Sequence, residues 1–244
     1  MFVKSNKDTL KYYLLVTFII TWGLSWGLIP IFKLSLSSSL GNLLYLIGGY
    51  GPTIAAFFCL KDKSWKEIKK FLFHPNKGSW RYLLGFLLLQ IVVIGLSSRQ
   101  SSGRVPLHLL PILLLQATTL FGGNEELGWR GVMQPLLEQK LPFTLTTVTT
   151  GSVWAVWHLP LWFINNSIQS QFPFYQFAIY AIVLSFVMAV IYQRSQSVFY
   201  CSVFHGVSNV LIGFFAIKIN LFLVGGLVLL VVISVLLRKP HLSS

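Results

Sequence analysis

A chain of 244 residues in which 55% are hydrophobic and only 10% are charged is too apolar for a water-soluble domain with a single core. The apolar runs are of helical length rather than the ten-residue alternating segments of a membrane β-barrel, so we predict an all-α, polytopic membrane bundle. The net charge of +13 lies mostly in short loops beside these runs, which favours membrane lipids as partners and excludes nucleic acid.

The first two apolar segments are read as spans. The run from about Tyr12 to Phe32 follows three lysines but is too long for a cleaved signal peptide, and no small-residue cleavage site follows it. A second run, from about Leu40 to Leu60, contains Gly48-Gly49-Tyr50-Gly51-Pro52. Because proline lacks an amide donor and glycine permits a break, this span is predicted to be kinked.

A basic segment from Lys61 to Arg81 follows the second span. Trp65, Ile68 and Leu72 recur in it at helical spacing, which predicts an amphipathic helix lying at the membrane surface. A solvated loop is the alternative interpretation, and neither implies catalysis.

Six further apolar segments bring the predicted number of spans to about eight. They cover residues 80–96, 106–137, 143–164, 174–192, 198–217 and 221–237. The polar residues 97–104 are predicted to form a loop before the fourth span, which we expect to continue as one helix past the glutamates of residues 125 and 126. No internal repeat is evident, which argues against an inverted-repeat transporter.

The distribution of basic residues predicts the orientation. When eight spans alternate, 15 of the 19 Lys and Arg residues fall on the side of the two termini. By the positive-inside rule both termini are therefore predicted to be cytoplasmic. The four on the opposite side are Lys33, Arg99, Arg104 and Lys218.

Three of the apolar segments carry polar side chains that hydrocarbon does not tolerate singly, which makes them candidates for a functional site. These residues are Glu125, Glu126 and Arg130 in the fourth span, His158 in the fifth, and His205 and Asn209 in the seventh. An ion pair between Glu126 and Arg130, four residues apart, would explain why Glu126 is present but would not explain Glu125. Each histidine alone could be a packing residue, but three polar helices together favour one shared site.

Simple geometry brings these residues together. The fourth and fifth helices form a hairpin with its turn near residue 140, so Glu125 should face residue 155, within one turn of His158. His205 and Asn209, at positions i and i+4, share one face of their helix and can point at a common atom.

This set of groups suits hydrolysis in a dry cavity. A buried Glu can act as general base on a water, and neutral His or Asn side chains can donate hydrogen bonds to a developing oxyanion. Alternatively, Glu125, His158 and His205 can bind Zn²⁺ and leave an open position for water, although H-E-x-x-H is absent. Cys59 and Cys201 show no metal or redox spacing and are expected to be small buried hydrophobes.

The polar residues also carry a family resemblance. Residues 125–131 resemble the E-E-x-x-x-R motif of the CAAX protease and bacteriocin-processing (CPBP, or Abi) family of intramembrane proteases. Trp154 to His158 matches the family's F-x-x-x-H with Trp in place of Phe, and His205 to Asn209 matches H-x-x-x-N. With Gly51-Pro52 and Ala55-Ala56, the resemblance covers about residues 40–215 of a chain expected to be one membrane-embedded domain, 1–244.

The resemblance implies a membrane-embedded endopeptidase of a bacterial or archaeal cell membrane, acting on a lipidated protein or a peptide by CAAX-type or leader-peptide processing. It implies that Glu125 activates the water and that Glu126 and Arg130 support it. His158 would assist, and His205 with Asn209 would stabilise the oxyanion.

The family resemblance is compatible with a metalloprotease or a metal-independent glutamate protease. We favour the latter, with no cofactor, because Asn is a poor zinc ligand and a good amide donor; zinc is the alternative. Two rival functions are bacteriocin self-immunity by binding alone, and proton-coupled transport through a relay formed by Glu125, Glu126, His158 and His205.

Overall fold

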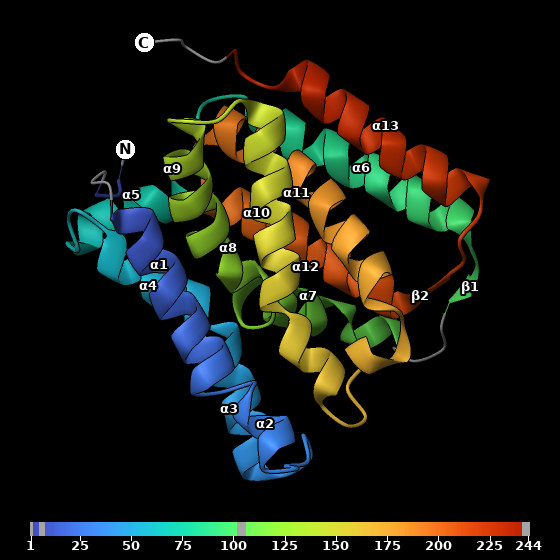
Figure 1. Cartoon of the computed structure of the whole chain (residues 1–244). Helices are drawn as coiled ribbons and strands as arrows, with labels where there is room; N and C mark the ends of the chain where they lie inside the picture. The colour runs from blue at the N-terminus through green and yellow to red at the C-terminus, as the bar shows by residue number, and fades with distance from the viewer. Residues whose placement is uncertain (1, 5–7, 102–105, 241–244) are drawn as a thin grey trace.

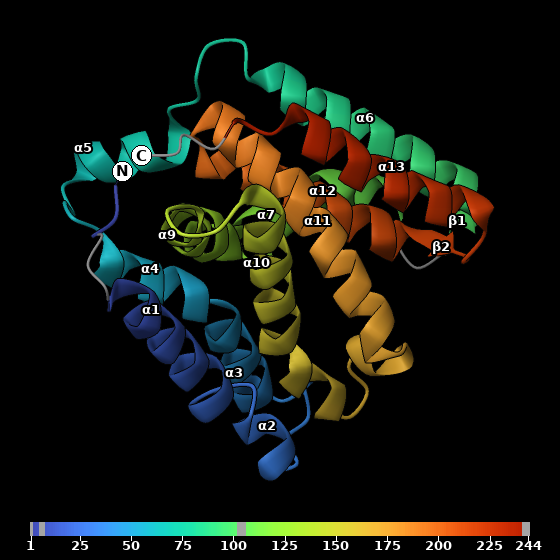
Figure 2. The same cartoon turned by 45° about the horizontal axis from the view of Figure 1, so that its top comes forward.

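The computed structural model describes residues 2–4, 8–101 and 106–240, and in these the chain forms a helical bundle (Figure 1). Helices α1 (Thr9–Phe18) to α4 (Gly51–Cys59) form one flank of the molecule. On the other flank, α6 (Trp80–Ser97) and α13 (Leu221–Leu237) lie side by side in both views (Figures 1 and 2). The helices of residues 107–214 lie between these flanks. The predicted all-α fold class is confirmed.

The first span begins as α1 (Thr9–Phe18), passes through a π-helical turn (Ile19–Gly23) and ends with α2 (Leu28–Ile31). The second consists of α3 (Ser39–Gly49) and α4 (Gly51–Cys59), which are bent by 41° at the predicted kink. The indole ring of Trp26 packs directly against this kink. The contact is so close that a Cβ built on Gly48 would lie 2.2 Å from the ring.

The fourth segment differs from the continuous helix that was predicted. A 3₁₀ turn (Leu107–Leu109) leads into α7 (Leu110–Thr119), which stops at a turn where Gly122 has a φ of +119°. The chain then resumes helical structure in short pieces. These are a 3₁₀ turn (Gly123–Glu125), α8 (Glu126–Gly128), a π-helical turn (Trp129–Met133) and α9 (Gln134–Glu138). The break has a local cause, since only glycine adopts such a φ without strain.

The later elements follow the predicted ranges closely. They are α10 (Phe143–Trp157), two 3₁₀ turns (Leu159–Phe163 and Gln169–Gln171), α11 (Phe174–Ser195) and α12 (Val198–Phe214). Helices α10 and α11 pack closely where Gly151 meets the backbone of Ile182. The loop predicted over residues 97–104 is mostly a strand where the structure describes it, because β1 (Ser98–Ser101) pairs antiparallel with β2 (Phe215–Ile217); residues 102–104 lie outside the described residues.

The protein is an integral, multi-pass membrane protein, with four described helical segments long and apolar enough to cross a bilayer. They are Thr9–Ile31, Trp80–Ser97, Leu107–Glu138 and Phe174–Ser195, and the bent pair α3 and α4 makes a fifth if it is one span. Helices α12 and α13 are apolar but have 17 residues, and α10 has 15. Eight crossings and cytoplasmic termini therefore stay predictions.

The basic segment between the second and third spans forms α5 (Trp65–Phe73), as predicted for an amphipathic helix. Trp65 is exposed, whereas Phe71 is buried against Gly131 in the π-helical turn after α8. Both cysteines are buried, as expected of small hydrophobes. The core therefore reaches from α5 to the segment that carries the glutamates.

Candidate active site

Gly122 makes the turn that precedes the glutamates, and two of the predicted site residues face it. A Cβ built on Gly122 would lie 2.4 Å from Nδ2 of Asn209 and 2.8 Å from Nε2 of His205. The two α12 side chains therefore converge on one point beside this glycine, as their i, i+4 spacing predicts. Its positive φ and its lack of space both exclude a larger residue.

Asn124 fixes the turn in place. Its Oδ1 accepts a hydrogen bond from the Gly122 amide at 3.1 Å, and its Nδ2 donates to the Gly49 carbonyl at the kink of the second span at 3.0 Å. From the other side, the Ser202 hydroxyl on α12 donates to the Gly123 carbonyl at 2.6 Å. Asn124 was not among the predicted site residues, although two glycines followed by asparagine are a recognisable turn signal.

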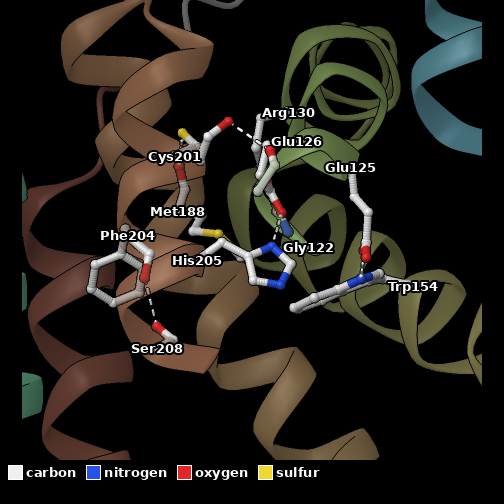
Figure 3. A network of polar contacts seen from close by, with 12 residues as sticks. Gly122, Glu125, Glu126, Arg130, Trp154, Met188, Cys201, Phe204, His205 and Ser208 are labelled. Carbon is white, nitrogen blue, oxygen red and sulfur yellow. Dashed lines mark hydrogen bonds and ion pairs between the residues drawn. The ribbon is translucent and has the colours of Figure 1, made fainter. Parts of the chain in front are cut away.

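Glu126 is the centre of a fully buried cluster of charged groups (Figure 3). Its Oε2 accepts a hydrogen bond from Nε of Arg130 at 2.9 Å, which is the predicted i, i+4 ion pair. Its Oε1 lies 2.8 Å from Nδ1 of His205, a contact that spacing alone did not predict. Arg130 also donates from Nη1 to the Ser185 hydroxyl on α11 at 2.8 Å, so the cluster joins three helical segments.

Glu125 points away from this cluster, toward the end of α10 (Figure 3). Its Oε2 accepts a hydrogen bond from the Trp154 indole at 2.7 Å, and its Oε1 lies 3.8 Å from Nε2 of His158. The predicted hairpin geometry is confirmed. Glu125 was expected to face residue 155, and it contacts Trp154 and His158, which lie one residue before and three residues after that position.

The protonation pattern of His158 follows from its neighbours. Its Nδ1 lies 3.0 Å from the carbonyl oxygen of Trp154, an acceptor, so Nδ1 carries the proton. The neutral ring then presents Nε2 as an acceptor facing Oε1 of Glu125. The 3.8 Å gap between these two acceptors is too long for a hydrogen bond, and one water donating to both atoms can bridge it.

The indole of Trp154 connects the two histidines. Its ring lies 5.1 Å from that of His205 and 5.8 Å from that of His158, in edge-on contacts. Phe177 on α11 closes the far side of His158, with ring centroids 4.9 Å apart. An apolar aromatic wall thus surrounds polar groups that would otherwise contact hydrocarbon.

Asn209 lies differently from the dry cavity that the sequence predicted for it. Glu125, His158 and His205 are 4%, 9% and 3% exposed, whereas Asn209 is exposed and donates from Nδ2 to the Phe121 carbonyl at 3.1 Å. The reason is its position opposite the turn after α7, where Phe121 is itself 42% exposed. The site is therefore buried at the glutamates and open at Asn209.

The predicted zinc ligands do not form a compact donor group. Among residues 2–4, 8–101 and 106–240, no three His, Cys, Asp or Glu side chains are grouped as a metal site requires. Nδ1 of His205 bonds Glu126, and His158 presents Nε2 only to Glu125. These donors do not fit zinc as arranged, so no catalytic step is assigned to a metal.

The part of the chain that carries the polar motifs is similar to known proteins. Residues 106–211 match the model of a family described as Type II CAAX prenyl endopeptidase Rce1-like, and this range includes all three polar motifs. A protein named CAAX prenyl protease 2, from Methanococcus maripaludis, is 29% identical over an alignment of 189 residues, and the match covers 69% of this chain and 68% of the relative.

Proposed function

We propose that this chain is a member of the CAAX protease and bacteriocin-processing family of intramembrane proteases and that it cleaves a peptide bond near the C-terminus of a prenylated protein. The observation that supports this most directly is the pair of acceptors formed by Glu125 and His158 inside an aromatic wall. The prenyl substrate class comes from the names of the matched family and relative. The catalytic role proposed for each site residue rests on the contacts of its side chain.

Glu125 is the proposed general base. A water placed between its Oε1 and Nε2 of His158 donates one hydrogen bond to each, which directs an oxygen lone pair toward a bound carbonyl. Glu125 takes a proton as the water oxygen bonds to the carbonyl carbon. The Trp154 indole holds the other carboxylate oxygen and so fixes the orientation of the base.

The carbonyl oxygen gains the negative charge in this step, and the proposed donors to it are Asn209 and His205 beside Gly122. Nδ1 of His205 faces the Glu126 carboxylate, so donation from Nε2 as well requires that the imidazole carry both protons. Glu126 stabilises this positive charge. This differs from the neutral histidine expected from the sequence.

Collapse of the tetrahedral intermediate breaks the C–N bond. The protonated Glu125 gives its proton to the leaving amine as the oxyanion re-forms the carbonyl, which leaves a carboxylic acid at the new C-terminus. Transfer of the acid's proton to the released amine then gives a carboxylate and an ammonium group. Glu125 is then ready for another water. Every proton and electron pair is accounted for by the substrate, one water and residues of this chain.

The test is cleavage of a fluorogenic farnesylated CAAX peptide by purified protein in lipid nanodiscs. Wild-type protein should release the tripeptide, and Glu125→Gln, which keeps the shape but removes the base, should show no turnover above background. Glu67→Gln on the surface helix α5 is the matched control and should cleave normally. Retained turnover by Glu125→Gln would contradict the mechanism, and equal cleavage of the peptide without its farnesyl group would contradict the substrate class.

A further inference from the structure

The first span contains a π-helical turn, Ile19–Gly23, in which two neighbouring residues contact one residue of α10. The Trp22 indole donates to the carbonyl oxygen of Trp157 at 2.9 Å, and the Trp157 indole donates to the Thr21 hydroxyl at 2.8 Å. π-Helical turns inside α-helices are rare and are frequent at functional sites.

The Thr21 hydroxyl extends this connection to the second span. It donates to the Gly48 carbonyl at 2.8 Å while it accepts from Trp157, so both of its hydrogen-bonding roles are used. Thr21 and Trp157 are completely buried. Gly51 leaves room for the hydroxyl, since a Cβ there would lie 2.3 Å from it. Three hydrogen bonds thus tie the first span and the kink of the second to the end of α10.

The end of α10 is where His158 is placed. Trp157 is the last residue of the helix, His158 follows it directly, and the two rings meet edge-on at 4.6 Å. A shift of Trp157 would therefore carry the His158 backbone with it and change the 3.8 Å separation from Glu125.

We infer that Thr21 and Trp22 are positioning residues that act through Trp157 on His158. The inference rests on the proposed function, in which His158 and Glu125 hold the attacking water. Both residues lie outside residues 106–211, to which the family model matches, so the match did not point to them. The first span is thereby part of the catalytic apparatus and more than a membrane anchor.

The same segment offers a matched control for a role in packing alone. Thr17 lies one turn before Thr21 and is also completely buried, but its hydroxyl faces Tyr13 and makes no hydrogen bond to Trp157 among the described residues. Thr17→Val and Thr21→Val make the same change of shape at both sites. Only Thr21→Val removes a connection to Trp157.

Steady-state cleavage of the farnesylated peptide tests the inference. Thr21→Val should lower kcat about tenfold with KM within about twofold, because small displacements of catalytic groups act on the chemical step. Thr21→Ser, which keeps the hydroxyl, should restore kcat, and Thr17→Val should match wild type. Combining Thr21→Val with His158→Gln should add little to the loss caused by His158→Gln alone, because both changes act on one group.

Two results would overturn the inference: equal losses in Thr17→Val and Thr21→Val, or fully additive losses in the double variant. A readout without activity separates this inference from the proposed function. ¹⁵N-histidine NMR of the full chain should show the His158 ring nitrogens shifted by Thr21→Val and unmoved by Thr17→Val. If the wild-type protein cleaves no peptide but Thr21→Val shifts the His158 signals, the proposed function is wrong and the positioning role of Thr21 stands. If Thr21→Val leaves the His158 signals unmoved, the positioning role is wrong.

Discussion

Nδ1 of His205 lies 2.8 Å from Oε1 of Glu126, and the carboxylate's other oxygen accepts from Arg130, with no part of Glu126 or Arg130 exposed. Removing one member of a buried ion pair leaves an uncompensated charge, which costs roughly 3 to 5 kcal/mol. We therefore expect Glu126→Ala to destabilise the folded protein by about this amount, measured by denaturant unfolding in detergent micelles.

The neighbouring glutamate is the control for this measurement. Glu125 accepts a hydrogen bond from a neutral indole, so Glu125→Ala should destabilise the protein much less while it abolishes cleavage. The double variant Glu126→Ala with Arg130→Met should recover part of the lost stability, because it removes both charges. Equal destabilisation by the two single glutamate variants would contradict the division between a structural and a catalytic carboxylate.

Gly122→Ala should cause a large loss of activity. The added methyl group meets Nδ2 of Asn209 and Nε2 of His205 at less than van der Waals distance, at a φ of +119° that strains alanine. We expect kcat/KM to fall about 100-fold or more in the peptide assay. Gly95→Ala on α6, where a Cβ meets no described atom within 4 Å, should leave kcat/KM unchanged.

Trp154→Phe should have a smaller effect. Phenylalanine stands at this position in the F-x-x-x-H motif that the sequence resembles, and it keeps the aromatic wall while it removes the indole donor to Glu125. One hydrogen bond to a charged group contributes about 1.5 kcal/mol, so kcat should fall about tenfold. Trp154→Ala removes the wall as well and should lose far more; equal losses in the two variants would show that the hydrogen bond has no separate role.

Metal dependence can be measured directly. Because the candidate zinc ligands bond to other groups and do not form a compact donor set, cleavage should persist in excess EDTA or 1,10-phenanthroline. Elemental analysis of the same active preparation should show zinc well below one atom per chain. Stoichiometric zinc, with activity lost to chelator and restored by added metal, would replace the glutamate mechanism with a metal-assisted one.

The sequence predicted the features that depend on local pattern. Apolar length located the helices, the Gly-Pro cluster located the bend near Pro52, and helix rise placed Glu125 opposite His158. It failed where the backbone leaves regular helix. Gly122 was predicted to lie within one continuous helical span, because the apolar residues on both sides of it outweighed the local turn signal.

The contacts between distant segments were also missed. An indole that donates to a backbone carbonyl 135 residues away, as Trp22 does to Trp157, has no characteristic spacing in a sequence. The same holds for the approach of His205 to Glu126, 79 residues away. Polar residue type indicates that a partner is needed in a membrane, but only the packing of the helices identifies it.

The two buried carboxylates and the two buried cations of the site have a consequence for how the reaction proceeds in a low-dielectric interior. With His205 doubly protonated, Glu125 and Glu126 balance Arg130 and His205, and the site is neutral overall. In the proposed mechanism, Glu125 accepts a proton and its negative charge moves to the substrate oxygen beside His205. The site thus changes where its charge lies without changing its total, so no ion has to enter or leave the membrane during bond cleavage.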